Sequence, residues 1–145
     1  MVDKKHVAML KRSVEEWNQW RNAHLRILPR LSGVNLVGAS LAGANLTQAD
    51  LRHADLRRAD LSTANLTQAS VAGAILRQAD LRQANLTHAN LWGANLAGAI
   101  LVKADLTGAN FEGANLVGAS LTGAILKEAN FKGANLTGVD LPETR

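Results

Sequence analysis

The side chains of this chain that could do acid–base, nucleophilic or metal chemistry are few and scattered. Cysteine and tyrosine are absent, and four histidines occur: His6, His24, His53 and His88. No two histidines have a spacing that places metal ligands on one element, and no serine has a base beside it. The aspartates recur at regular positions instead of forming close pairs. These observations predict a protein that is not an enzyme and holds no cofactor, metal or small-molecule substrate.

The other candidate chemistry is recognition of a partner. Arginines gather in the middle of the chain, and a single tryptophan follows them. We take six residues as a candidate interaction patch: Arg52, Arg57, Arg58, Arg77, Arg82 and Trp92. Aspartates alternate with these arginines, so the stretch is also typical of a solvated face with weak ion pairs of ~0–1 kcal/mol each. The tryptophan likewise has two interpretations, an interface anchor or a lone exposed ring.

A five-residue repeat must position these side chains, and it runs from Val34 to Glu143 without insertion or deletion. Its central residue, i, recurs at every fifth position from Leu36 to Leu141, which gives 22 centres, nineteen of them Leu. Position i−2 is Ala in twenty units, and Gly recurs at i+2. Position i−1 is Asn, Asp or Ser, except at three isoleucines: Ile75, Ile100 and Ile125.

A period of five fits neither regular element. On an α-helix, successive centres would drift by about 140° per unit, and on a flat strand they would change face each time. The repeat therefore predicts a short extended step followed by a corner, with i−2 and i inside and i−1 outside. Glycine at i+2 accepts the positive φ of such a corner. We expect the asparagines at i−1, such as Asn90, Asn110 and Asn130, to form hydrogen-bonded turn ladders.

Corners of about a right angle would close one coil every four units. Residues twenty positions apart then stack, and the sequence supports this spacing. One outward column is all threonine: Thr47, Thr67, Thr87 and Thr107. We expect a cross-strand threonine ladder there. The only two phenylalanines, Phe111 and Phe131, fall in one interior column, where we expect their rings to stack. The units amount to about five and a half coils of parallel rungs.

The uninterrupted Ala-Asn/Asp-Leu-x-x pattern resembles that of the pentapeptide-repeat family over roughly three-quarters of the chain. The resemblance implies an all-β solenoid, a right-handed quadrilateral parallel β-helix with four pentapeptides per coil. The segment from Val14 to Arg21, with Pro29 and Leu31-Ser32-Gly33 after it, is similar to the leader of cyanobacterial-type members and implies a bacterial source. Some family members mimic duplex DNA and bind type II topoisomerases. Here residues 31–145 hold nine basic and nine acidic residues, so complementarity to a DNA-binding groove is poor.

Residues 1–30 are expected to form a capping helix and linker ahead of the solenoid over residues 31–145, within one structural domain. One amphipathic helix is predicted from Asp3 to about His24, with Asp3 as its N-cap. Its apolar face is expected to cover the open end of the core. That face comprises Val7, Leu10, Val14, Trp17 and Trp20. Pro29 ends the helix, and Leu31 has the register of a first centre.

The net charge of +4 falls entirely on residues 1–30, which hold seven basic and three acidic residues. A basic amphipathic helix can also bind an acidic surface, so weak binding of a membrane surface or an acidic partner is the alternative to a cap. Nucleic-acid binding is disfavoured, because aspartates interrupt the arginines, which are spread over three faces. We therefore expect a rigid protein-interaction or scaffold element with an unidentified protein partner.

No apolar run is long enough to cross a membrane or to serve as a secretory signal, which favours a cytoplasmic location. Only four residues follow Leu141, so we expect no helix over the last coil. Pro142 and the charges beside it would protect an open edge. Alternatively, two uncapped C-terminal coils would pair in a homodimer.

Overall fold

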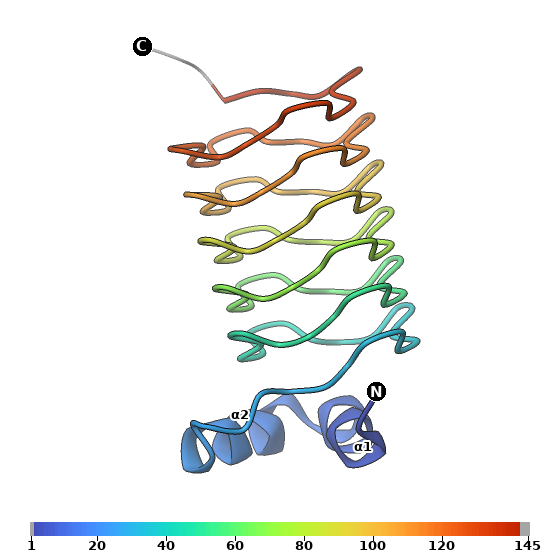
Figure 1. The fold of residues 1–145 in the computed structure, drawn as a ribbon, viewed down its shortest axis with the longest axis vertical. Coiled ribbons are helices and arrows are strands. Elements are labelled where there is room, and N and C mark those ends of the chain that lie inside the picture. The colour runs from blue at the N-terminus through green and yellow to red at the C-terminus, as the bar shows by residue number, and fades with distance from the viewer. Residues whose placement is uncertain (1, 143–145) are drawn as a thin grey trace.

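The computed structural model describes residues 2–142. It contains two helices, α1 (Lys4–Arg12) and α2 (Val14–Ala23), followed by a stack of coils. In Figure 1 the helices lie across one end of the stack, and the chain then winds away from them coil by coil. Neither helix is long and apolar enough to cross a membrane, as far as the described residues go.

The prediction of one continuous N-terminal helix is wrong, because Ser13 breaks it. Ser13 has an extended backbone with φ −164°, and its hydroxyl oxygen accepts the Glu16 N–H at 3.1 Å as the N-cap of α2. Asp3 caps α1 as predicted, since its carboxylate accepts the N–H groups of Lys5 and His6. A serine followed three residues later by glutamate is the sequence signature of a helix start. Here it ends α1 and starts α2 in a new direction, and the two helices remain in contact.

Coils are joined by parallel bridges between residues twenty positions apart. Asp55 pairs with Ile75, for example, and Ile75 pairs in turn with Asn95. From Leu31 to Leu116, each unit donates from its centre and its i+2 residue to the coil that follows. Leu36 N–H binds the Asp55 carbonyl at 2.8 Å in this way. The 20-residue spacing therefore closes each coil with four units, as the columns predicted.

Every corner is a turn with a left-handed residue at i+2. The centre carbonyl accepts the N–H three residues later, as in Ala39 to Leu36 at 3.0 Å, and φ at i+2 is positive from Gly33 to Gly138. This is the geometry of a type II turn, which favours glycine at that position. The glycine interpretation is confirmed, but ten units place a non-glycine residue there instead, among them Arg58.

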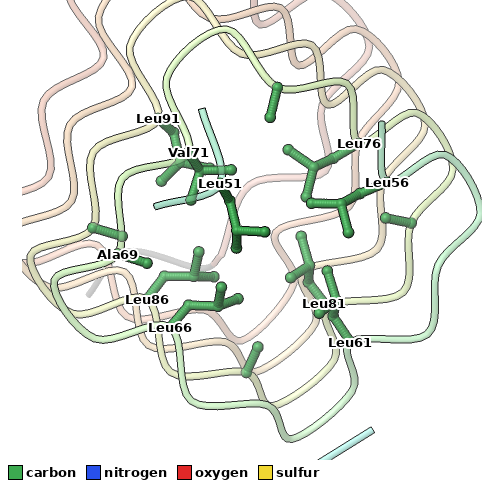
Figure 2. Close-up of a cluster of buried hydrophobic side chains, with 14 of the residues drawn as sticks. Leu51, Leu56, Leu61, Leu66, Ala69, Val71, Leu76, Leu81, Leu86 and Leu91 are labelled. Atoms are coloured by element: carbon green, nitrogen blue, oxygen red, sulfur yellow. The ribbon is translucent and has the colours of Figure 1, made fainter. Parts of the chain in front are cut away.

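The interior is filled by i−2 alanines and i leucines, which point inward from all four sides of the coil (Figure 2). Side chains from Leu41 to Leu121 at the centres are almost fully buried. Phe111 and Phe131 stack as predicted. In the last described coil, Leu126, Phe131 and Leu136 are only partly buried.

The two helices close the other end of the core. Leu10 and Trp17 are fully buried in one cluster with the solenoid leucines, while Val7, Val14 and Trp20 are half-buried against it. The Trp17 indole N–H donates to the Asn45 carbonyl at 2.8 Å. The chain enters the first coil at Pro29, which is buried at the i−2 position, and Leu31 is the first centre.

The threonine column is in register, but its side chains do not bond to one another. Thr67, Thr87 and Thr107 each donate their hydroxyl to the Asn or Asp two residues earlier, at 2.6 Å. The asparagine ladder forms as predicted, because Asn110 donates to Asn90 at 3.3 Å and Asn130 to Asn110 at 3.2 Å.

Candidate interaction surface

The six residues of the predicted patch fall on three faces of the solenoid, so they do not form one surface. Arg52 and Trp92 share a column, because they lie two coils apart, and Arg82 lies on another face. Arg57, Arg58 and Arg77 come together on the third face. They surround a hollow of about 340 Å³ with Val37 and Gln78, which we call the arginine hollow.

Three of the five arginines are paired with an aspartate of their own unit. Arg52 binds Asp50 through two hydrogen bonds of 2.8 Å. The pairs Arg57–Asp55 and Arg82–Asp80 have the same two-pronged geometry. Each carboxylate also accepts the backbone N–H of its arginine.

These contacts shift the pKa values of both partners in the direction that favours their charged forms. The hydrogen bonds from the Arg52 guanidinium hold the pKa of the Asp50 carboxyl below its ordinary value. The pKa values of Asp55 and Asp80 are lowered by Arg57 and Arg82 in the same way. The guanidinium groups are exposed, so water screens each pair and the pair contributes little to stability. For these three arginines the geometry is that of a solvated, ion-paired face.

The arginine hollow differs from the other faces because its positive charge is not balanced. Arg57 is held by Asp55, whereas the Nε–H of Arg58 donates to the neutral Gln78 at 3.1 Å. Within residues 2–142 no carboxylate pairs with Arg58 or Arg77. The hollow therefore presents two free positive charges beside the exposed aliphatic side chain of Val37.

Trp92 stands clear of the solenoid, with 56% of its surface exposed. The backbone N–H of Trp92 donates to the side-chain oxygen of Asn90 at 3.1 Å, which fixes the backbone beneath the ring. Small or polar residues flank it in its column, Ala72 one coil earlier and Glu112 one coil later. Trp92 is therefore an isolated apolar side chain, and it lies on a different face from the arginine hollow.

An apolar segment that the sequence analysis did not single out follows α2. Leu25 is 75% exposed, and Ile27 and Leu28 are about half exposed. Arg26 and Arg30 flank them, and a groove of about 730 Å³ separates this segment from Asp3 and Asp50. The available signal was that these aliphatic residues fit neither the helical period nor the five-residue repeat.

The junction between the helices and the first coil contains two buried ionisable side chains, those of His6 and Arg21. His6 is 6% exposed, packs against the rings of Trp17 and Trp20, and accepts the Arg30 N–H on Nδ1 at 3.2 Å. Arg21 is 5% exposed and donates to the carbonyls of Ile27 and Thr47, at 2.8 and 2.7 Å. Burial lowers the pKa of both groups.

A family model described as pentapeptide repeats matches residues 30–68, 64–101 and 104–141. No curated protein matches the chain.

Solved structures show the same similarity. A pentapeptide repeat protein from the cyanobacterium Cyanothece is 34% identical with a TM-score of 0.76, over 86% of this chain and 97% of that one. HetL of the cyanobacterium Nostoc, involved in heterocyst differentiation regulation, is 41% identical with a TM-score of 0.34, over 82% of this chain and 60% of HetL. A protein of the Arabidopsis thaliana thylakoid lumen is 31% identical with a TM-score of 0.45, over 79% of this chain and 71% of that one. The match to the Cyanothece structure supports a right-handed quadrilateral β-helix.

Proposed function

Because this chain belongs to the pentapeptide-repeat family, we propose that it is a rigid, non-catalytic protein-interaction element. Its backbone is committed to hydrogen bonds between coils, and its interior is filled with alanine and leucine. Outward positions alone vary freely in such a repeat. Recognition therefore falls to the exposed side chains at i−1, i+1 and i+2.

The arginine hollow is the observation that carries this proposal. Elsewhere on the solenoid, arginines are neutralised by aspartates two residues earlier, so their charge is used within the molecule. Arg58 and Arg77 keep their charge beside an exposed aliphatic residue. Arginine next to apolar surface is typical of protein interfaces, and the two free charges favour an acidic partner. The same positive charge argues against a DNA-mimicking role, which needs a negative rod.

Affinity capture with matched variants tests the interaction function. The tagged intact chain is incubated with lysate of its source organism, and retained proteins are identified by mass spectrometry. In one variant Arg57, Arg58 and Arg77 are replaced by Ser. In the control, Arg52, Arg82 and Lys132 are replaced by Ser, which removes the same charge from other faces. We expect a partner that wild type and control retain and the first variant loses.

Two results would count against the proposal. If the wild-type chain enriches no protein over a tag-only bait, the interaction function fails. If both variants retain the partner equally, the arginine hollow is not the contact surface. Trp92→Ala, run in parallel, reports whether the isolated ring contributes to the same partner.

A further inference from the structure

The aspartate or asparagine at i−1 has a fixed structural task in this solenoid. In the described units that carry Asn or Asp there, its side-chain oxygen accepts the backbone N–H of the i+1 residue. The one exception is Asp140, because its i+1 residue is Pro142, which has no N–H. Asn35 with Val37, at 3.1 Å, is one example. Where i+1 is arginine, the same carboxylate also binds the guanidinium. In each such unit, the backbone N–H and the guanidinium of the arginine together bind the carboxylate of the same unit.

The unit of Arg77 has the two donors of this site but lacks the carboxylate. Ile75 takes the i−1 position, and its side chain is exposed. No group within residues 2–142 accepts a hydrogen bond from the Arg77 amide or guanidinium. The same substitution occurs at Ile100 and Ile125, but Val102 and Lys127 follow there. Among the units within residues 2–142, only that of Ile75 therefore has an arginine at i+1 without a carboxylate at i−1.

The surroundings of Arg77 increase its attraction for an anion. One coil earlier, Asp55 has both oxygens bound by Arg57. One coil later the column continues with the uncharged residues Asn95 and Ala97. Arg58 lies in the same hollow and faces only Gln78. Neighbouring charges therefore add to the positive potential at Arg77.

We propose that Arg77 and Arg58 bind the carboxylate of an acidic side chain on a protein partner, in the role that Asp50, Asp55 and Asp80 play for their own arginines. The fork of a guanidinium matches a planar carboxylate with two parallel hydrogen bonds. Val37 lines the hollow with exposed aliphatic surface, which an apolar residue beside the acid would cover. A free inorganic anion would leave that surface in water.

This inference rests on the proposed interaction function and narrows its partner to a protein segment with alternating acidic and aliphatic residues. The test uses the intact ¹⁵N-labelled chain and an acetylated, amidated peptide, Gly-Glu-Leu-Glu-Gly. Binding is followed by the amide shift of Arg77 in NMR spectra. We expect saturable binding, and loss of binding with the control peptide Gly-Gln-Leu-Gln-Gly.

Two variants of the repeat itself provide matched controls. Ile75→Asp supplies the missing carboxylate from within, at a position where aspartate is ordinary for this repeat, and should weaken peptide binding about tenfold. Ile75→Ala removes the same side chain without adding an acceptor and should retain binding. Asp80→Ile frees Arg82 in the same manner and should create a second site, detected at the Arg82 amide.

Three outcomes would overturn the inference: unchanged binding to Ile75→Asp, unchanged binding to Arg77→Ser, or tighter binding of inorganic phosphate than of the glutamate peptide. The last outcome would assign the hollow to a free oxyanion instead of a protein side chain. The two proposals can fail separately. A chain that captures a protein partner but does not bind the peptide would contradict the carboxylate site and leave the interaction function standing.

Discussion

The ring of Phe131 lies over the ring of Phe111, with centroids 4.9 Å apart and planes inclined by only 8°. The two rings occupy successive levels of one interior column, where most other levels hold leucine. Phe111 is fully buried, whereas Phe131 is half-buried in the last described coil. The pair therefore tests how much the core contributes at two depths.

Replacement of Phe111 by Ala should lower the free energy of unfolding by about 3–5 kcal/mol, because it opens a cavity in a tightly packed interior. Phe131→Ala should cost less, since water already reaches that ring. Urea unfolding followed by circular dichroism measures both losses. Phe111→Leu places the commonest centre residue there and serves as the mild control. Equal losses at the two sites would contradict this account of the core.

The stability of the chain should depend on pH through His6. Burial lowers the pKa of His6 from its ordinary value of 6.5, Arg30 and Arg21 lower it further, and Asp3 opposes them. Between the lowered value and 6.5 the unfolded chain binds more protons than the folded chain. The contribution of His6 to the free energy of unfolding is therefore fully present above pH 6.5 and is lost as the pH drops through this window.

Thermal unfolding at a series of pH values checks this dependence on His6. His6→Gln keeps a side-chain acceptor and cannot be protonated, so its curve should be flatter than that of wild type between pH 6.5 and the lower end of the window. Parallel curves would exclude His6 as the cause. The aspartates paired with arginine have lowered pKa values, and their contribution is lost at still lower pH.

Arg21 should be among the most costly side chains to remove from the N-terminal segment. Its guanidinium joins α2 to two carbonyls, those of Ile27 and Thr47. Arg21→Met leaves both acceptors without their donor, and we expect a loss of about 2–4 kcal/mol in urea unfolding. Arg12→Met removes only an exposed pair with Glu16 and should change stability by about 0.5 kcal/mol or less. Similar losses in the two variants would contradict the structural role of Arg21.

Two glycine corners separate the cost of positive φ from the cost of crowding. Gly73 and Gly93 have φ of +67° and +63°, so either Ala variant should cost about 1 kcal/mol from backbone strain. An added Cβ at Gly73 also meets the His53 ring at 2.5 Å, whereas nothing lies within 4 Å at Gly93.

Gly73→Ala should therefore be the less stable variant in thermal unfolding. In a His53→Ala background the excess should disappear, because the neighbouring ring is gone. An excess that persists without His53 would assign it to the backbone instead.

The five-residue period predicted the coil well, because the same local constraints apply to every unit. Alanine and leucine must face inward, the turn needs positive φ, and a 20-residue column brings Phe111 to Phe131 and Asn90 to Asn110. Such local constraints are visible in the chain itself. The resemblance to the pentapeptide-repeat family then added the handedness, which periodicity alone does not determine.

The N-terminal segment and the arginines were predicted less well, because their contacts are specific to one place. Ser13 has the spacing of a helix start, but the apolar stripe on both sides of it suggested one helix. His6 and Arg21 are polar residues buried by tertiary packing, which no period reveals. The pairing of Asp50 with Arg52 depends on the direction of two side chains at a corner. Once that direction is known, the exception at Ile75 becomes the informative residue.

The hydrogen bonds between coils run along the axis of the stack, and they also determine its mechanical behaviour. A pull on the two ends of the solenoid loads the coils in series, so one rung of hydrogen bonds opens at a time. Each event frees the twenty residues that separate bridged partners, which is about 70 Å of extended chain. Under tension the molecule would lengthen in equal steps, like a spring that yields turn by turn.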